Sequence, residues 1–229
     1  MSLCGEGAVC IWNDIAPEVE ADFYAWHIAE HMPERVGIPG FLRGRRYVAV
    51  DAATSPRFFT LYETLTPEVL AGVDYLARLN APTPWTRRAT AGFRNTYRAL
   101  TRVRASMGRG PGGMLAALRL TLPADQQESA ADALVTRLLP VIARQALITG
   151  AHLCTTDMEA SAGRTTESKD RSDILVPPNT VVMIEGCTSD ALASTMDAVV
   201  RELGVEMASS ALGFYRIEYT RLKTDYAPG

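Results

Sequence analysis

Short runs of hydrophobic residues alternate along this chain with longer stretches in which apolar residues recur at helical spacing. Strands are expected where β-branched and aromatic residues lie between turn residues. Helices are expected where a capping residue or a proline precedes apolar positions three or four residues apart. In the first half of the chain, this pattern predicts strands at 8–15, 41–51, 57–65 and 93–105, and helices at 17–37 and 66–80.

The second half repeats this order after a glycine- and proline-rich segment, SMGRGPGG (106–113), which is typical of a linker. The pattern there predicts strands at 114–123, 148–158, 180–188 and 212–223, and helices at 124–147 and 189–203. Each half therefore has the order β-α-β-β-α-β of a ferredoxin-like unit. We predict an α+β fold of two such repeats, 1–107 with the candidate site and 108–229 as a divergent copy.

The predicted strands carry apolar or aromatic side chains on both faces. In the third strand, Phe59 and Leu61 alternate with Phe58 and Tyr62. An antiparallel sheet with one wet face would alternate more clearly between apolar and polar residues. The antiparallel sheets are therefore expected to pack face to face, either within one chain or between the two chains of a homodimer.

Composition and charge are those of an ordinary globular protein, with 47% hydrophobic residues, 21% charged residues and a net charge of −3. The absence of a basic run argues against nucleic-acid binding, and no apolar run reaches the roughly 20 residues that span a bilayer. The N-terminal sequence lacks the features of a signal peptide. The cysteines form no C-x-x-C pair, which favours free thiols in a reducing compartment. We predict a cytoplasmic protein that acts on a small molecule.

The segment HIAEH holds two of the three histidines, His27 and His31, with Glu30 beside the second. H-x-x-E-H is the pattern of the inverted zinc peptidases, and two histidines one helical turn apart can chelate a metal. A zinc site needs a further ligand, and nothing in the sequence selects one. We therefore predict no metal, and consider His31 either a general acid/base or a histidine satisfied by a backbone carbonyl at the helix end.

The segment FYAWHIAEHMPERVGIPGFLRGRRY resembles the dimeric α+β-barrel superfamily, and within it the EthD-like branch. The resemblance rests on Trp26, His31, Pro33 and Pro39-Gly40-Phe41, and covers residues 8–105 well and 112–223 by element order alone. That superfamily includes muconolactone isomerases, cofactor-free monooxygenases, polyketide cyclases and haem enzymes. If Ile148-Thr149-Gly150 corresponds to Ile38-Pro39-Gly40, Val141 takes the place of His31, so one polar site per chain is expected.

The resemblance and the residue chemistry together give a candidate site. A histidine with a pKa near neutrality can donate or accept a proton, and arginines can stabilise developing oxyanion charge. The segment 159–173 is expected to be a mobile surface loop, either closing over the site or remaining disordered. The predicted catalytic residues are His31, Arg45 and Arg87, and the predicted substrate-binding residues are His27, Trp26, Tyr47, Tyr62 and Trp85.

Three functions remain open at this level. The first is a cofactor-independent isomerase, lyase, cyclase or monooxygenase that acts on an apolar or aromatic carbonyl or carboxylate compound. The second is a non-catalytic EthD-like binding or accessory protein, and the third is a haem or metal protein. The sequence contains no dinucleotide fingerprint, P-loop or nucleophile elbow, so we expect no cofactor.

Overall fold

The computed structural model describes residues 2–205 and 211–224 and forms one sheet of nine strands flanked by helices. The strands are β1 (Gly7–Ile15), β2 (Phe41–Ala49), β3 (Phe58–Thr64), β4 (Phe93–Gly108), β5 (Met114–Leu120), β6 (Ile148–Thr156), β7 (Ile174–Leu175), β8 (Thr180–Gly186) and β9 (Ala211–Leu222). The helices are α1 (Glu20–Trp26), α2 (Met32–Gly37), α3 (Val73–Asn80), α4 (Pro84–Thr90), α5 (Ala124–Ala133), α6 (Leu139–Ile142), α7 (Met158–Ala162) and α8 (Ser189–Leu203), with 3-10 turns η1 (Pro17–Val19) and η3 (Pro67–Ala71) and π-helical turns η2 (His27–His31) and η4 (Leu134–Leu138).

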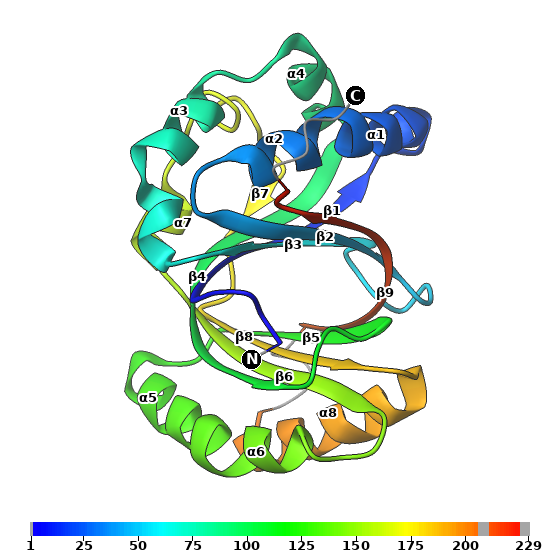
Figure 1. The fold of residues 1–229 in the computed structure, drawn as a ribbon, viewed down its shortest axis with the longest axis vertical. Helices are drawn as coiled ribbons and strands as arrows, with labels where there is room; N and C mark the ends of the chain where they lie inside the picture. The colour runs from blue at the N-terminus through cyan, green and yellow to red at the C-terminus, as the bar shows by residue number, and fades with distance from the viewer. Residues whose placement is uncertain (1, 206–210, 225–229) are drawn as a thin grey trace.

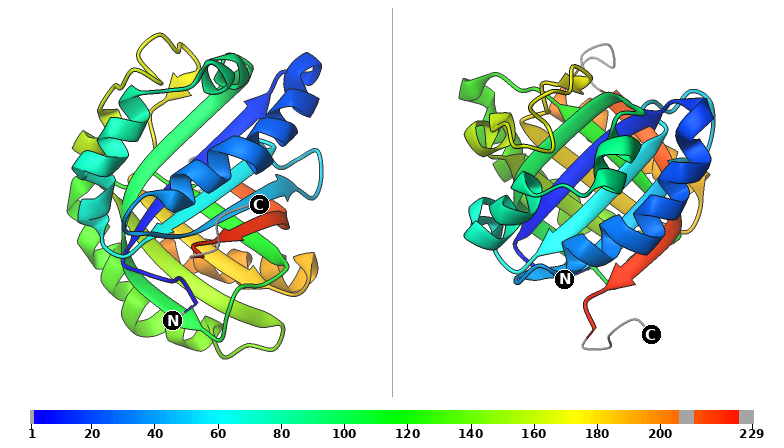
Figure 2. Two further views of the ribbon diagram at one scale, coloured as in Figure 1. Left: turned by 45° about the horizontal axis from the view of Figure 1, so that its top comes forward. Right: turned by 90° about the horizontal axis from the view of Figure 1, so that it is seen from above.

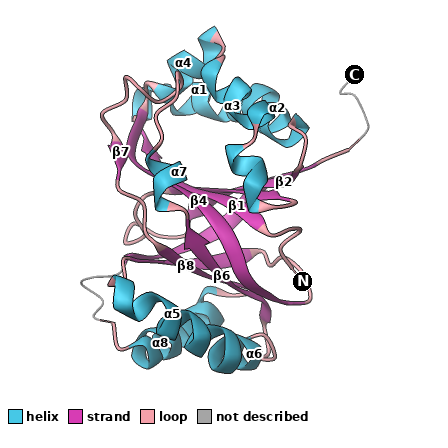
Figure 3. Cartoon of the chain, turned by 90° about the vertical axis from the view of Figure 1, so that its left-hand side faces the viewer, coloured by secondary structure: helices cyan, strands magenta, loops and turns pink. Residues whose placement is uncertain are grey.

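Eight of the strands close into an antiparallel barrel in the order β1-β3-β2-β9-β5-β8-β6-β4, because β4 also pairs with β1. Strands β4 and β9 each pair with both halves of the chain: β4 with β1 and β6, and β9 with β5 and β2. Helices α1 and α2 cover one side of the barrel, and α5, α6 and α8 cover the opposite side (Figures 1 and 3). The prediction of two ferredoxin-like units with their sheets face to face is confirmed.

Several boundaries differ from the prediction for local reasons. The expected helix 66–80 is divided at the extended residue Gly72, and α4 begins inside the expected loop because Thr83 caps the backbone N–H of Thr86. Strand β4 runs to Gly108, into the expected linker. Strand β7, which pairs parallel with β4, was not expected from the sequence. The repeat boundary at 107/108 and the homodimer stay predictions.

The barrel interior combines aromatic rings with buried charges. Trp12 stacks on Phe59 with 4.8 Å between ring centroids. Arg45 donates from Nε to Glu63 (3.0 Å) and from Nη1 to Glu185 (2.8 Å), and all three side chains are at most 1% exposed. Although burial favours the protonated acid, the hydrogen bond with His152 and the charge of Arg45 hold the pKa of Glu185 at about 2. This network ties β2 and β3 of the first half to β8 of the second.

The N-terminal segment enters between the two sheets (Figure 1) and joins the same network. The Ser2 hydroxyl lies 3.1 Å from Nε2 of His152, and the Ser2 carbonyl accepts a hydrogen bond from Arg43. The Leu3 backbone N–H donates to the Ser106 hydroxyl. Ser2 and Leu3 are therefore held inside the barrel, where both are buried.

The helix that carries the HIAEH segment continues through Pro33 to Gly37, with a π-helical turn before the proline. The backbone N–H of Met32 donates to the carbonyl of His27, five residues earlier. A proline ring clashes with the preceding turn of an ordinary α-helix, and the wider π turn accommodates it. His31 consequently lies inside a helix, not at the helix end that the sequence suggested.

The second half has the same irregularity. The π-helical turn η4 also precedes a proline, Pro140, at the second position of the next helix. Matching the two π turns pairs His31 with Leu138, so the predicted correspondence with Val141 is wrong by three residues. The expectation that this half lacks the histidine is unaffected.

Candidate functional site

A small, partly open cavity of about 50 Å³ lies between the first-half helices and the outer face of β1, β3 and β4. His31 and Trp26 come from the first helix and Tyr62 from β3, so three of the sequence-predicted residues meet here. The rings of Trp26 and His31 lie 4.2 Å apart. The remaining lining residues are Ile11, Arg35, Tyr75, Leu79, Thr90, Phe93, Thr96, Arg98, Glu167 and Arg171.

Three buried polar atoms of lining residues have no hydrogen-bond partner in the described parts of the chain. They are Nδ1 of His31, the hydroxyl of Tyr62 and Nη1 of Arg35. Buried polar atoms are nearly always paired, and an unpaired one costs roughly 1–3 kcal/mol. The imidazole is a base, the phenol a neutral hydrogen-bond donor and the guanidinium a cation. A polar ligand bound in the cavity could supply the missing hydrogen-bond partners of all three groups.

The surroundings of His31 keep its imidazole neutral. Burial lowers the pKa of His31 well below its usual value, and the charges of Arg35, His27 and Arg78 lower it further. The neutral ring can accept a proton at physiological pH, whereas the sequence suggested a pKa near neutrality. Burial likewise raises the pKa of Tyr62, so this side chain stays a phenol that can donate a hydrogen bond.

The neutral histidines should make the protein less stable in mild acid. Burial, followed by the charge of Arg46, also lowers the pKa of His27 well below its usual value. Above about pH 6.5 both histidines are mainly neutral in the folded and the unfolded state. Below that pH only the unfolded state takes up protons, so acid stabilises the unfolded state relative to the folded one. Between pH 6 and 5 we expect the free energy of unfolding to fall by roughly 2 kcal/mol, measured by urea denaturation. The fall should be about half as large in His27→Gln, and an unchanged slope would contradict this origin.

Glu30, the acidic residue of the H-x-x-E-H pattern, binds to the start of α4 and not to the cavity. Its Oε1 accepts hydrogen bonds from Nε1 of Trp26 and from the hydroxyls of Thr83 and Thr86. The carboxylate thereby joins the first helix to the N-terminal turn of α4. Among the described residues, no group of three or more histidine, cysteine, aspartate or glutamate side chains is placed to hold a metal ion.

His27 lies next to His31 but does not line the cavity. The two ring centroids are 5.4 Å apart. Nδ1 of His27 lies 3.4 Å from Nη1 of Arg46, and its ring packs against Phe23. A direct contact between His27 and a ligand in this cavity, as predicted from the sequence, would require rearrangement.

Arg45 and Tyr47 lie on the opposite face of β2, inside the barrel. Alternate residues of a strand point to opposite faces, and in β2 it is Gly44 and Arg46 that face the helices, where they contact Tyr62 and Tyr24. Arg45 is held by Glu63 and Glu185. The prediction that Arg45 and Tyr47 share a site with His31 must therefore be corrected: the sheet separates them.

Trp85 and Arg87 belong to α4 and lie outside the cavity. Nε1 of Trp85 donates to Asp22 of α1 (3.0 Å), which fixes this ring against the first helix. Arg87 is exposed and lines an outer hollow of about 230 Å³ next to the cavity. Of these two predicted residues, Arg87 alone lines a hollow that adjoins the cavity.

The segment between α7 and β7, residues 163–173, lies beside α3 and α4 (Figure 2). Its Glu167 and Arg171 line the cavity. Its Glu167 forms an ion pair with Arg35, and the Glu167 backbone N–H donates to the carbonyl of Leu79 (3.1 Å). The sequence prediction left open whether this segment closes over the site, and in the structure it lies against the cavity.

Arg35 could have been identified from the sequence, because it lies four residues after His31 on the same helix face. No spacing in the sequence relates Glu167 to this site.

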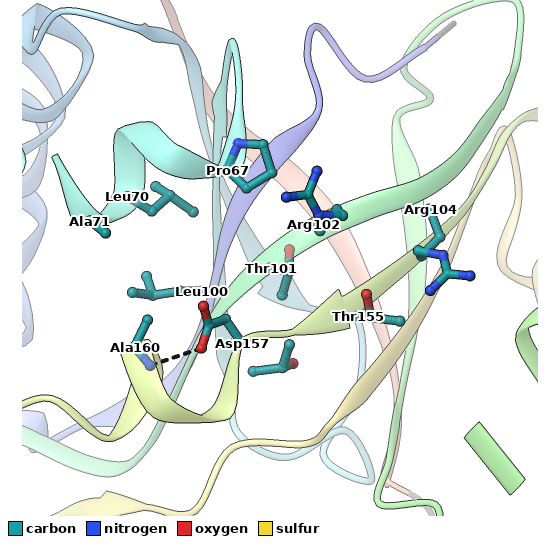
Figure 4. A pocket seen from close by; sticks show the side chains of 11 residues that line it. Pro67, Leu70, Ala71, Leu100, Thr101, Arg102, Arg104, Thr155, Asp157 and Ala160 are labelled. Atoms are coloured by element: carbon teal, nitrogen blue, oxygen red, sulfur yellow. Dashed lines mark hydrogen bonds between the residues drawn. The ribbon is translucent and has the colours of Figure 1, made fainter. Parts of the chain in front are cut away.

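A larger hollow lies elsewhere, on the outer surface where β4 passes from one sheet to the other (Figure 4). It measures about 290 Å³ and contains none of the predicted site residues. Its charged groups already have partners: Arg102 pairs with Glu68, Arg104 pairs with Glu128, and Asp157 caps the N–H of Ala160. The His31 cavity is therefore the stronger candidate site.

No known protein family matches the sequence, and no curated protein is similar to it. Solved structures match it in fold. An anthrone oxidase-like protein superimposes with a TM-score of 0.61 at 13% identity, covering 94% of this chain and 92% of its own. A monooxygenase-like protein of Fusobacterium nucleatum subsp. nucleatum gives 0.57 at 8% identity over 96% of both chains. A chlorite dismutase variant of Candidatus Nitrospira defluvii gives 0.53 at 8% identity, covering 92% of this chain and 91% of its own.

These similarities show that the chain has the dimeric α+β-barrel fold. At 8% to 13% identity they concern the fold alone, and one fold can host many unrelated reactions. Ligand pockets usually measure roughly 300–1,000 Å³; the cavity, at about 50 Å³, holds neither a haem nor a tricyclic aromatic compound unless its lining moves. No helix in the described parts of the chain is long and apolar enough to cross a bilayer.

Proposed function

We propose that this protein is an enzyme that performs cofactor-independent acid/base chemistry on an apolar or aromatic carbonyl or carboxylate compound in the His31 cavity. The observation that carries the proposal is a set of buried atoms on residues of one cavity that have no hydrogen-bond partner within 2–205 and 211–224: Nδ1 of His31, the hydroxyl of Tyr62 and Nη1 of Arg35. Buried titratable groups with perturbed pKa values in a cavity are typical of functional sites.

The chemistry suited to these groups is the removal of a proton from carbon next to a carbonyl group. The neutral imidazole of His31 accepts the proton, and the electron pair of the broken C–H bond moves onto the carbonyl oxygen. The phenol of Tyr62 donates a hydrogen bond to the resulting oxyanion, and the nearby cation of Arg35 stabilises negative charge on the bound compound. Trp26 and Phe93 supply apolar walls that exclude water. Returning the proton to another carbon gives an isomerase.

The fold neighbours favour aromatic ketones as substrates within this proposal. One of them is anthrone oxidase-like, and anthrone is a tricyclic aromatic ketone whose methylene protons are acidic. Others are monooxygenase-like. A cofactor-free oxygenation is a variant of the same first step, in which dioxygen is the co-substrate that adds to the carbanion.

The test follows proton removal itself, so the complete reaction need not be known. Anthrone in deuterated buffer is incubated with the protein, and loss of the methylene proton signal is followed by NMR. We expect the enzyme-dependent exchange rate to be independent of pH from about 6.5 to 8, because His31 is already neutral, and to fall in acid as its lowered pKa is approached.

Two results would contradict the proposal. Exchange that rises as the pH falls below 6.5 would mean that the protonated imidazole is the active form. Ligand binding without exchange, for anthrone and a panel of aromatic ketones, would favour the alternative of a binding or accessory protein.

A further inference from the structure

We propose that Arg35 is the anion-recognition residue of the His31 site, that its ligand is an aromatic carboxylate, and that Glu167 occupies the carboxylate position until the ligand displaces it. The inference rests on the proposed function in locating the site, and adds the chemical class of the ligand and the residue that competes with it.

Arg35 is set up for a carboxylate. Its side chain is 3% exposed, and its Nη2 donates to Oε2 of Glu167. Its Nη1 lies 3.9 Å from Oε2 of Glu34, an ion pair too long for a hydrogen bond, and has no hydrogen-bond partner in the described parts of the chain. A guanidinium presents paired donors that match both oxygens of one carboxylate. Glu167 uses one side of this fork, so a carboxylate aligned with the whole fork would make an additional hydrogen bond.

The carboxylate that Arg35 now binds comes from a segment with little to anchor it. No residue between 163 and 176 is buried. Around Glu167 the segment is joined to α3 by backbone and side-chain hydrogen bonds at Leu79 and Asn80; its attachment to β4, through Thr96 and the short strand β7, lies further along the chain, at 171–175. Segments with few buried contacts open at low free-energy cost.

Glu167 also lies between two hollows. It lines the inner cavity of about 50 Å³ beside His31 and the outer hollow of about 230 Å³ beside α4. Thr90 and Arg171 line both as well. Withdrawal of the Glu167 side chain would join the two volumes into a space near the lower limit of known ligand pockets, roughly 300 Å³. The outer hollow is therefore the route by which a ligand reaches Arg35.

Charge and shape together select an aromatic carboxylate. Once Glu167 withdraws, three arginines (Arg35, Arg98 and Arg171) line the inner cavity without a lining carboxylate, although Arg171 remains paired with Asp173. The rings of Trp26, Tyr62, Tyr75 and Phe93 form the apolar part of the wall. An aromatic acid places its carboxylate on Arg35 and its ring among these side chains, within reach of His31.

The experiment compares 2-naphthoate with its neutral isostere 2-naphthamide by calorimetry, on the full-length protein. In the wild type the carboxylate must compete with Glu167. In Glu167→Gln the competing charge is gone, and we expect 2-naphthoate to bind about tenfold more tightly while 2-naphthamide changes less than twofold. Glu159→Gln, an exposed residue of α7, is the matched control and should leave both affinities unchanged.

A second variant tests Arg35 directly. Arg35→Lys keeps the charge and loses the fork, so the preference for 2-naphthoate over 2-naphthamide should fall about tenfold. If either variant unfolds, the wild type alone tests the proposal. It should bind 2-naphthoate more tightly than 2-naphthamide, and this preference should disappear at high salt. Equal affinity for the two compounds, or equal tightening of both in Glu167→Gln, would overturn the proposal. Because binding is measured without turnover, absence of proton exchange on any substrate would refute the proposed function and leave this inference standing.

Discussion

Replacing Arg45 with methionine is expected to lower the free energy of unfolding by about 3–5 kcal/mol. The substitution keeps much of the side-chain volume but removes the cation that lies between Glu63 and Glu185, each at most 1% exposed. Glu63 stays paired with Arg43, but Glu185 loses its arginine. Removing one partner of a buried ion pair leaves charge in the interior that is poorly compensated, and this accounts for a loss of that size. Urea denaturation at pH 7 measures it.

Arg137→Met is the matched control for this experiment. Arg137 pairs with Glu202 on the surface, where the two side chains are 67% and 44% exposed. An exposed pair contributes at most about 1 kcal/mol, so this variant should unfold near the wild-type midpoint. A loss for Arg45→Met no greater than that of the control would show that the barrel interior is hydrated.

His31→Gln is expected to reduce the rate of proton exchange on anthrone by about 10²–10⁴, the usual contribution of a general base. Glutamine keeps a polar side chain of similar length but cannot accept the proton. The folded structure should persist, because Nδ1 of His31 makes no hydrogen bond in the described parts of the chain. Binding of the ketone, measured by calorimetry, should change less than tenfold.

His27→Gln separates the role of His31 from a general effect of altering this helix. His27 is also buried and neutral, but it lies beside Arg46 and does not line the cavity. We expect its exchange rate to fall less than tenfold. Equal losses in the two variants would assign the effect to helix packing and contradict the role of His31.

The architecture was accessible from the sequence, because the repeated order of elements and the apolar residues on both strand faces are local properties. Because side chains alternate along a strand, the sequence also places Arg45 and Arg46 on opposite faces of the sheet. The alternation alone does not tell which face packs against the helices and which face lines the barrel interior. Arg45 and Tyr47 share the strand face that hydrogen-bond and ring contacts place inside the barrel, so the error was to combine them with His31, which lies on the helix side of the sheet.

The cavity was predictable only in part, because its residues come from distant segments. His31, Trp26 and Tyr62 were expected from residue chemistry and resemblance. The participation of Glu167 depends on how an insertion of the second half folds back over α3, and no spacing rule relates residue 167 to residue 35. The π-helical turn before Pro33, which changes where His31 points, likewise arises from tertiary packing and from a proline that normally ends a helix.

The pairing of β2 with β9 has a consequence for synthesis of the chain. The first unit can form its four strands as soon as they leave the ribosome, but the outer edge of β2 then has no partner until the C-terminal strand has been made. An unpaired edge is a template for aggregation, and charged side chains are the usual protection. Arg43, Arg45 and Arg46 lie on this edge strand. Their charges should disfavour pairing of β2 with another chain while the second half is being translated.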